Sequence, residues 1–192
     1  LQKFEHMIAY RSKKFFTASN CEMVIGGVAS TYRRDILEKV GYYDTDTITE
    51  DIGLSMKVAA LGNKDNKLVY AADVAAMTEG VPTFNMLLTQ RYRWKLGMIQ
   101  NLLKYRQMMF SKDKNYSKML TWYRYPMAYL GELLILLEPI ALAYIIYISA
   151  KYIGGPLLFI GAYTTITLYV LIVVWHDEHL DLRGRIKTSM LA

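Results

Sequence analysis

The chain has 192 residues, of which 53% are hydrophobic and only 21% charged, a composition that excludes a disordered tail or a collagen-like repeat. Lys and Arg number 23 against 17 Asp and Glu, so the chain is basic. Its single cysteine excludes a disulfide scaffold and a zinc site built from several cysteines, and it fits a reducing compartment.

The first part of the chain has the pattern of a soluble α/β region. Periodicity predicts helices over 2–14 and 32–40 and a short strand over 67–71. An apolar stretch, 23–29, is interrupted by Gly26 and Gly27, which permit unusual backbone angles or the close approach of another molecule. An ordinary strand bend is the alternative. Because the chain opens without Met or a signal peptide, we expect an internal piece of a longer protein.

The sequence Thr49-Glu50-Asp51 precedes a predicted helix over 52–61. Thr49 is expected to cap this helix, which places both carboxylates in its first turn. There the helix dipole and the free N–H groups favour the ionised form, and an ionised Asp can act as a general base toward a hydroxyl. Acidic residues are also common at helix starts, so the motif alone leaves catalysis and capping open.

A long amphipathic helix is predicted from Phe84 onward, with a basic face suited to the membrane interface. Within it, Gln90, Arg93 and Trp94 are spaced by three and four residues and therefore share one face. A guanidinium can bind phosphate oxygens in bidentate fashion, and an indole offers a flat face to a sugar ring. The alternative is a Trp anchor with Arg side chains that reach lipid headgroups. We expect Gly97 to leave room beside Trp94.

Two apolar stretches, 126–150 and 152–175, are long enough to cross a bilayer core, which takes roughly 20 helical residues. A helix pair buried in a soluble protein is the alternative. Basic residues precede the first stretch and follow the second, whereas only Lys151 lies between them. The basic region is therefore expected on the cytoplasmic side. The first stretch contains Glu132 and Glu138, which are costly in a membrane and need a partner or a cavity.

The order of these features resembles the processive, membrane-integrated family 2 glycosyltransferases, which include synthases of poly-N-acetylglucosamine, cellulose, chitin oligomers and hyaluronan. The resemblance covers essentially the whole chain. It rests on the following residues: Gly26-Gly27, Arg33-Arg34-Asp35, Val40-Gly41, Asp44, Thr49-Glu50-Asp51 and Gln90-x-x-Arg93-Trp94.

The resemblance implies an α/β fold class, with the C-terminal part of a GT-A glycosyltransferase domain followed by an amphipathic interface helix and transmembrane helices. The implied parts are residues 1–83 of the cytoplasmic catalytic domain, interface helices over 84–125, two transmembrane helices over 126–175, and a cytoplasmic loop over 176–192 that leads to a further, truncated element. The protein would lie in the plasma or inner membrane as a multi-pass protein with its catalytic part in the cytoplasm.

The resemblance also assigns roles to matching positions. Asp51 would be the base that deprotonates the acceptor hydroxyl, and Glu50 would support the acceptor end. Gln90 and Arg93 would hold the diphosphate and the acceptor, and Trp94 would stack on the terminal sugar at the mouth of a membrane channel. The remaining implied substrate-binding positions are Thr49, Gly26 and Gly27, the two glycines near the acceptor path.

The implied reaction is an inverting transfer of a sugar, with N-acetylglucosamine favoured, from a UDP-sugar donor to a polysaccharide acceptor. Mg²⁺ or Mn²⁺ would be bound mainly by a motif outside this chain, and no metal site is expected within it. Asp44-Thr45-Asp46 has the spelling of such a motif but follows Gly41-Tyr42-Tyr43 instead of an apolar strand, so we expect a loop. The chain alone would then be inactive.

The partners expected are the two substrates and the lipid bilayer, and no nucleic acid, since the basic residues lie beside the predicted membrane segments. Two other functions are open. A non-processive transferase could glycosylate a membrane lipid with the same base but with less need of Trp94. A non-catalytic membrane partner would lack a working metal motif altogether.

Overall fold

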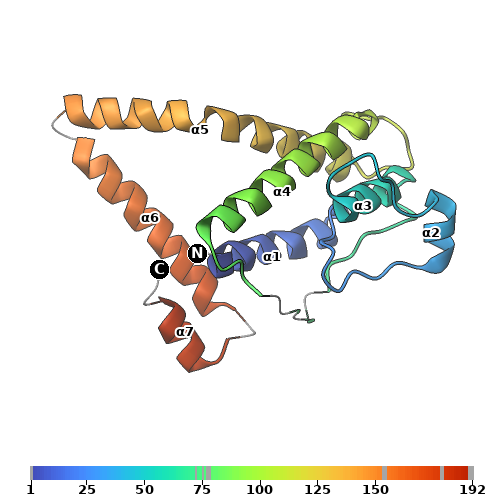
Figure 1. Cartoon of the computed structure of the whole chain (residues 1–192), viewed down its shortest axis with the longest axis horizontal. Helices are drawn as coiled ribbons and strands as arrows, with labels where there is room; N and C mark the ends of the chain where they lie inside the picture. The colour runs from blue at the N-terminus through green and yellow to red at the C-terminus, as the bar shows by residue number, and fades with distance from the viewer. Residues whose placement is uncertain are drawn as a thin grey trace. The chain divides into compact units, whose positions relative to one another are not determined.

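The computed structural model describes residues 2–71, 73–74, 76, 79–152, 155–177 and 180–189. These residues form helices joined by irregular segments (Figure 1). The elements are α1 (Gln2–Ala18), α2 (Arg34–Val40), α3 (Glu50–Ala60), α4 (Phe84–Lys104), the 3₁₀ turn η1 (Arg106–Met108), the π-helical turn η2 (Leu120–Arg124), α5 (Tyr125–Lys151), α6 (Gly155–Trp175) and α7 (Leu182–Ser189).

Contacts divide the chain into two compact units. One unit comprises residues 13–133, and the other comprises residues 1–12 together with 134–192. The first unit contains α2, α3, α4 and the first turns of α5, so both motifs of the candidate site belong to it. The predicted division into soluble, interface and membrane parts stays a prediction.

Local sequence signals mark where several helices begin and end. Gly41 ends α2 in the left-handed conformation, with φ 74°, which costs glycine little because it has no Cβ. Gly62, with φ 108°, follows the last residues of α3. Thr83 caps α4, because its Oγ1 accepts a hydrogen bond of 3.3 Å from the N–H of Met86. These predicted helices are therefore confirmed, with ends within a few residues of expectation.

The predicted strand over 67–71 does not form, and no other described residue belongs to a strand. A strand needs a neighbour that pairs with its backbone groups. In this stretch the N–H of Tyr70 donates instead to the Thr17 side chain, at 2.9 Å. The expected α/β class is thus not confirmed among the described residues, which are helical or irregular.

Helix α3 is the centre of the core in the unit formed by residues 13–133. Leu54, Met56 and Val58 of α3 are almost wholly buried, and so is Leu102 of α4. Burial of each such side chain contributes roughly 1.5–3 kcal/mol to stability. The same cluster includes Tyr125, whose hydroxyl donates to the Leu102 carbonyl at 2.8 Å and so ties the start of α5 to α4.

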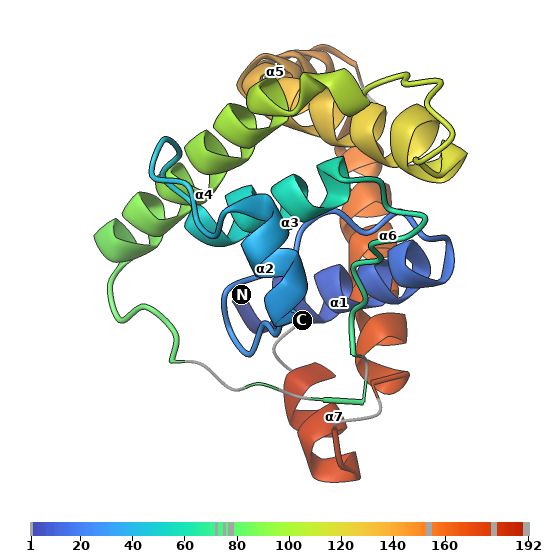
Figure 2. The same ribbon diagram turned by 90° about the vertical axis from the view of Figure 1, so that its right-hand side faces the viewer.

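Helices α3 and α4 approach closely at two glycines (Figure 2). A Cβ atom on Gly97 would lie only 2.1 Å from Oγ1 of Thr49, so no side chain fits there without displacing α3. On α3, a Cβ atom on Gly53 would lie 3.2 Å from Oδ1 of Asn101. The room that we expected beside Trp94 at Gly97 is therefore filled by Thr49.

Among the described residues, two helices are long and apolar enough to cross a membrane. The stretches are Leu120–Lys151 and Pro156–Trp175, of 32 and 20 residues, and each contains an 18-residue window with a mean hydropathy of 2.1 and 2.3, respectively. Most of their apolar side chains are exposed, unlike those of a helix in a soluble core. The first predicted span lies within α5, whereas α6 begins at Gly155, and residues 153 and 154 of the second predicted span lie outside the described residues.

The region 176–192, predicted to be a loop, contains the short helix α7, which packs against α6. The Arg185 guanidinium stabilises the connection, since it donates to the carbonyls of Asp177 and Leu180 at 2.9 and 3.1 Å. The further element expected at the end of the chain falls in part on residues 190–192, outside the described residues.

We expect Gly97→Ala to destabilise the protein, because the added methyl group would overlap Thr49 and force α3 away from α4. Overpacking of this kind typically costs about 1–3 kcal/mol. Thermal unfolding of the detergent-solubilised gene product would measure the loss. Gly131→Ala in α5 is the control, since a Cβ atom there meets nothing within 4 Å. Equal melting temperatures for the two variants would contradict the close contact.

Candidate active site

Asp51 lies in the first turn of α3, half-buried, with a backbone N–H bound to each carboxylate oxygen. Its Oδ2 accepts a hydrogen bond of 2.8 Å from the N–H of Gly27, and its Oδ1 accepts one of 2.8 Å from the N–H of Ile52. Glu50, one residue earlier, is exposed. Asp51, the predicted base, is therefore held both by its own helix, through Ile52, and by Gly27, which lies more than twenty residues earlier in the chain.

The two glycines differ in their surroundings. A Cβ atom on Gly27 would lie 3.4 Å from Oδ2 of Asp51, whereas one on Gly26 would meet nothing within 4 Å. Neither glycine has positive φ, so the unusual backbone angles that we considered do not occur at them. The left-handed residue of this turn is Ala29, with φ 56°. Gly27 thus brings its N–H close to Asp51, while Gly26 faces open space.

Ser55 of α3 anchors the segment that leads to Gly27. Its Oγ accepts a hydrogen bond of 3.0 Å from the N–H of Ile25 and lies 2.9 Å from the hydroxyl of Tyr32. The same Oγ lies 2.8 Å from the carbonyl of Asp51, one turn back along the helix. Sequence analysis did not single out Ser55, although its position four residues after Asp51 is a usable signal.

Thr49 occupies the N-cap position of α3, but its side chain does not cap the helix. Instead the residue is buried, and its Oγ1 is 3.4 Å from Nδ2 of Asn101, which also donates to the Gly97 carbonyl at 2.9 Å. The capping prediction is wrong because the side chain is directed against α4. The start of α3 is thereby fixed on α4 at Gly97.

Gln90, Arg93 and Trp94 lie on α4, on the same stripe as Gly97 and one or two turns before it. Gln90 is half-buried, Arg93 is exposed, and Trp94 is 38% exposed. The Arg91 guanidinium lies 4.8 Å from the centre of the Trp94 ring, a cation–π contact that sequence analysis missed. Because Thr49 contacts Gly97, the start of α3 lies one helical turn from Trp94 along α4.

The Asp44-Thr45-Asp46 sequence is a loop, as expected, and lysine side chains bind its carboxylates. Lys57 of α3 donates to Asp44 at 2.6 Å. Lys104 of α4 donates to Asp44 at 2.6 Å and to Asp46 at 2.8 Å. Hydrogen bonds from Lys104 and then from Lys57 hold the pKa of Asp44 below its ordinary value. Partial burial opposes protonation of Lys104, but its bonds to the two carboxylates raise its pKa above the ordinary value.

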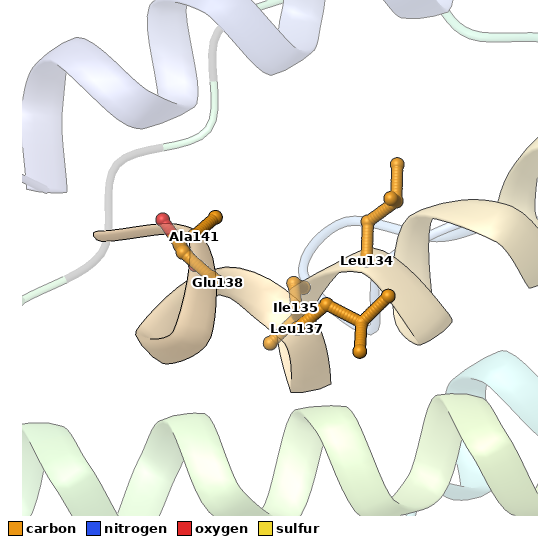
Figure 3. Close-up of a pocket in the computed structure, with 5 residues that line it drawn as sticks. All are labelled: Leu134, Ile135, Leu137, Glu138 and Ala141. Atoms are coloured by element: carbon orange, nitrogen blue, oxygen red, sulfur yellow. The ribbon is translucent and has the colours of Figure 1, made fainter. Parts of the chain in front are cut away.

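These contacts do not suit a divalent cation, because ammonium groups occupy the carboxylate oxygens that a metal would need. Among the described residues, no group of three or more His, Cys, Asp and Glu side chains is arranged to hold a metal ion. A shallow hollow lies along α5 and is lined by residues of that helix (Figure 3). Its residues are Leu134, Ile135, Leu137, Glu138 and Ala141.

Comparison with known proteins assigns the chain to a sequence family. The family described as "Glycosyl transferase family group 2" matches residues 4–176. Poly-beta-1,6-N-acetyl-D-glucosamine synthase of Staphylococcus epidermidis is 35% identical over 80 residues, which are 42% of this chain and 19% of the synthase. The synthase of the same name from Staphylococcus aureus is 33% identical over 93 residues, 48% of this chain and 22% of the synthase.

The matched stretches thus span about a fifth of the length of these relatives. No solved structure gives a significant match.

The lysine contacts of Asp44 predict a pH-dependent contribution to stability. The pKa of Asp44 is lower in the folded state than in the unfolded state, so the ionised carboxylate stabilises the fold. This stabilisation is fully present above the unfolded-state pKa, about 3.9, and is lost as the pH falls through the lowered folded-state pKa. We expect Asp44→Asn to lower the melting temperature at pH 7. The difference in melting temperature between the variant and wild type should become smaller below about pH 4. Melting curves across this range would test it. Asp65→Asn, at an exposed carboxylate of the same unit, is the control. A gap independent of pH would contradict the assignment.

Proposed function

The chain belongs to glycosyl transferase family group 2, and on this basis we propose that it transfers N-acetylglucosamine from a UDP-sugar to the growing end of a β-linked polysaccharide, with inversion at the anomeric carbon. The names of the two staphylococcal relatives, both poly-beta-1,6-N-acetyl-D-glucosamine synthases, support this sugar and this product. We propose further that its helices contribute to a GT-A catalytic domain on the cytoplasmic face of the membrane.

The observation that carries the proposal is the placement of Asp51. Its carboxylate is fixed at a helix start by the N–H of Gly27, and α3 is packed through Thr49 on the helix that bears Trp94. In the proposed reaction, Asp51 takes the proton of the acceptor hydroxyl as the acceptor oxygen attacks the anomeric carbon. The bond from that carbon to the diphosphate oxygen breaks, and UDP leaves.

The remaining site residues would position the substrates. The exposed Arg93 and the nearby Gln90 are suited to hold the diphosphate and the acceptor, and Glu50 to support the acceptor end. The partly exposed ring of Trp94 offers a face to the terminal sugar. Mg²⁺ or Mn²⁺ would assist departure of the diphosphate, and we propose that groups other than Asp44 and Asp46 hold it, since lysines bind both.

Placement in the membrane rests on α5 and α6 and on the surface just before α5. Phe110 and Trp122, both about half exposed, stack edge to face with ring centres 5.2 Å apart. Trp and other aromatic side chains favour the membrane interface, and exposed lysines at 112, 114 and 118 suit anionic headgroups. These features support a lipid bilayer as a partner. We propose in addition that the polymer leaves the cell through the membrane part of the protein.

We expect Asp51→Asn to abolish sugar transfer, because an amide cannot accept the hydroxyl proton. The assay is UDP release from membranes that contain the complete gene product, across a panel of UDP-sugars. Loss of a catalytic base typically lowers the rate by about a hundredfold or more. Glu38→Gln on the exposed surface of α2 is the control. Release that continues in the Asp51 variant would remove Asp51 from the reaction, and no release with any sugar in wild type would favour a non-catalytic partner.

We expect Trp94→Ala to shorten the polymer, because the terminal sugar would lose its stacking surface between successive additions. Product length by gel or mass spectrometry, at matched UDP release, measures this effect. Tyr43→Ala is the control, since Tyr43 is an exposed aromatic residue of the same unit. Unchanged length, or a product limited to a glycosylated lipid, would favour the non-processive alternative.

A further inference from the structure

The segment that presents Gly27 to Asp51, residues 22–27, belongs to no helix or strand and is called the Gly27 segment here. A segment without regular structure has no repeating backbone hydrogen bonds to fix it. Its position must therefore come from individual side chains. Ser55 holds its middle at Ile25, as described above, and a second set of contacts holds its start.

The start of the Gly27 segment is held by Glu22 and Lys13. Oε1 of Glu22 accepts hydrogen bonds from the N–H groups of Met23 and Val24, at 3.0 and 3.1 Å. Lys13, near the end of α1, donates its Nζ to the Val24 carbonyl and lies 3.7 Å from Oε2 of Glu22. Both polar backbone groups of Val24 are thus bound by this ion pair, only three residues before Gly27.

The Lys13–Glu22 pair is largely buried, which makes it unlike a surface ion pair. The Glu22 side chain has no exposed surface, and the Lys13 side chain is 22% exposed. Burial lowers the pKa of Lys13, and the charge of Glu22 opposes that shift. Removing either partner would leave the other charge largely buried without its ion-pair partner, which is more costly than losing an exposed pair.

A third charged side chain links the pair to the start of the first membrane helix. The Arg124 guanidinium, at the end of η2, lies 4.1 Å from the centre of the Phe16 ring, one turn from Lys13 on α1. Its positive charge acts on both Lys13 and Glu22. The Gly27 segment is therefore held between α1, α3 and the turn that opens α5.

We propose that Lys13 and Glu22 are positioning residues for sugar transfer, which fix the Gly27 segment so that the Gly27 N–H meets the Asp51 carboxylate. No hydrogen bond or ion pair joins either side chain to Asp51 among the described residues, although the charge of Asp51 acts on Lys13. They act through backbone groups: Val24 is held by the pair, Ile25 by Ser55, and Gly27 then reaches Oδ2. The catalytic part of this inference rests on the proposed function.

The first measurement is hydrogen exchange by mass spectrometry on the complete gene product, in membranes or detergent. We expect Lys13→Met and Glu22→Gln to raise exchange in peptides that span residues 22–30, with peptides from α4 unchanged. Lys13→Arg should keep most of the protection, because it keeps the charge. Lys39→Met and Glu38→Gln, on the exposed side of α2, are the matched controls. Exchange that rises equally in α4 would mean a general loss of stability and would overturn the proposal.

The second measurement is steady-state UDP release by the same variants. We expect kcat to fall about tenfold in Lys13→Met and Glu22→Gln while KM for the UDP-sugar changes less than about twofold, since the base is displaced but donor binding is not. Faster exchange at residues 22–30 with unchanged kcat would overturn the positioning role. If Asp51→Asn kept full turnover, the proposed function would fail, whereas the exchange result would still test the contacts of the pair.

Discussion

The candidate site depends on the close approach of α3 to α4 at Gly97. With only a hydrogen atom at this position, Thr49 can lie directly on the α4 backbone, and Asn101 then bonds to both Thr49 and the Gly97 carbonyl. A side chain at residue 97 would separate the helices by the width of at least a methyl group. The acidic first turn of α3 and the Gln-x-x-Arg-Trp stripe of α4 would then no longer lie beside one another.

The same stripe of α4 also fixes the loop that leads into α3. One turn beyond Gly97, the Gln100 side chain accepts a hydrogen bond of 3.0 Å from the N–H of Ile48. One turn further along α4, Lys104 donates hydrogen bonds to Asp44 and Asp46. Ordering this loop costs about 1–2 kcal/mol in backbone entropy for each residue fixed, and these contacts offset that cost. The C-terminal half of α4 therefore fixes the loop that leads to Asp51, the proposed base, and its N-terminal half presents the residues proposed to meet substrate.

Sequence signals predicted the parts of this site that are set locally. The predicted helices over 32–40 and from Phe84 onward, and the two apolar stretches, agree with the structure within a few residues, because capping, left-handed glycine and hydrophobic length act within one element. The predictions that depended on distant neighbours were wrong. Thr49 was expected to cap a helix and instead contacts a residue forty-eight positions away, and 67–71 lacks a strand partner among the described residues.

The charged residues show why burial cannot be inferred from residue type. Glu22 lies in a stretch with no pattern of its own, yet its side chain is wholly buried. Lys104 belongs to a helix predicted to meet lipid through its basic face, yet its charge is bound by two aspartates. Lys95, beside Trp94, pairs with Glu132 of α5 at 3.0 Å, so this acidic residue of the apolar run has its partner on α4.

Two contacts attach the first turns of α5 to α4 at different positions along α4. These are the Lys95–Glu132 ion pair and the hydrogen bond from Tyr125 to the Leu102 carbonyl. Residues through Leu133 consequently belong to the same compact unit as Asp51. An apolar helix that begins in the same unit as Asp51 cannot shift its first turns without disturbing α4, and α4 cannot move without disturbing Thr49. If the protein extends a polymer, the same contacts between α3, α4 and α5 would fix both the geometry of sugar addition and the point at which the polymer enters the membrane.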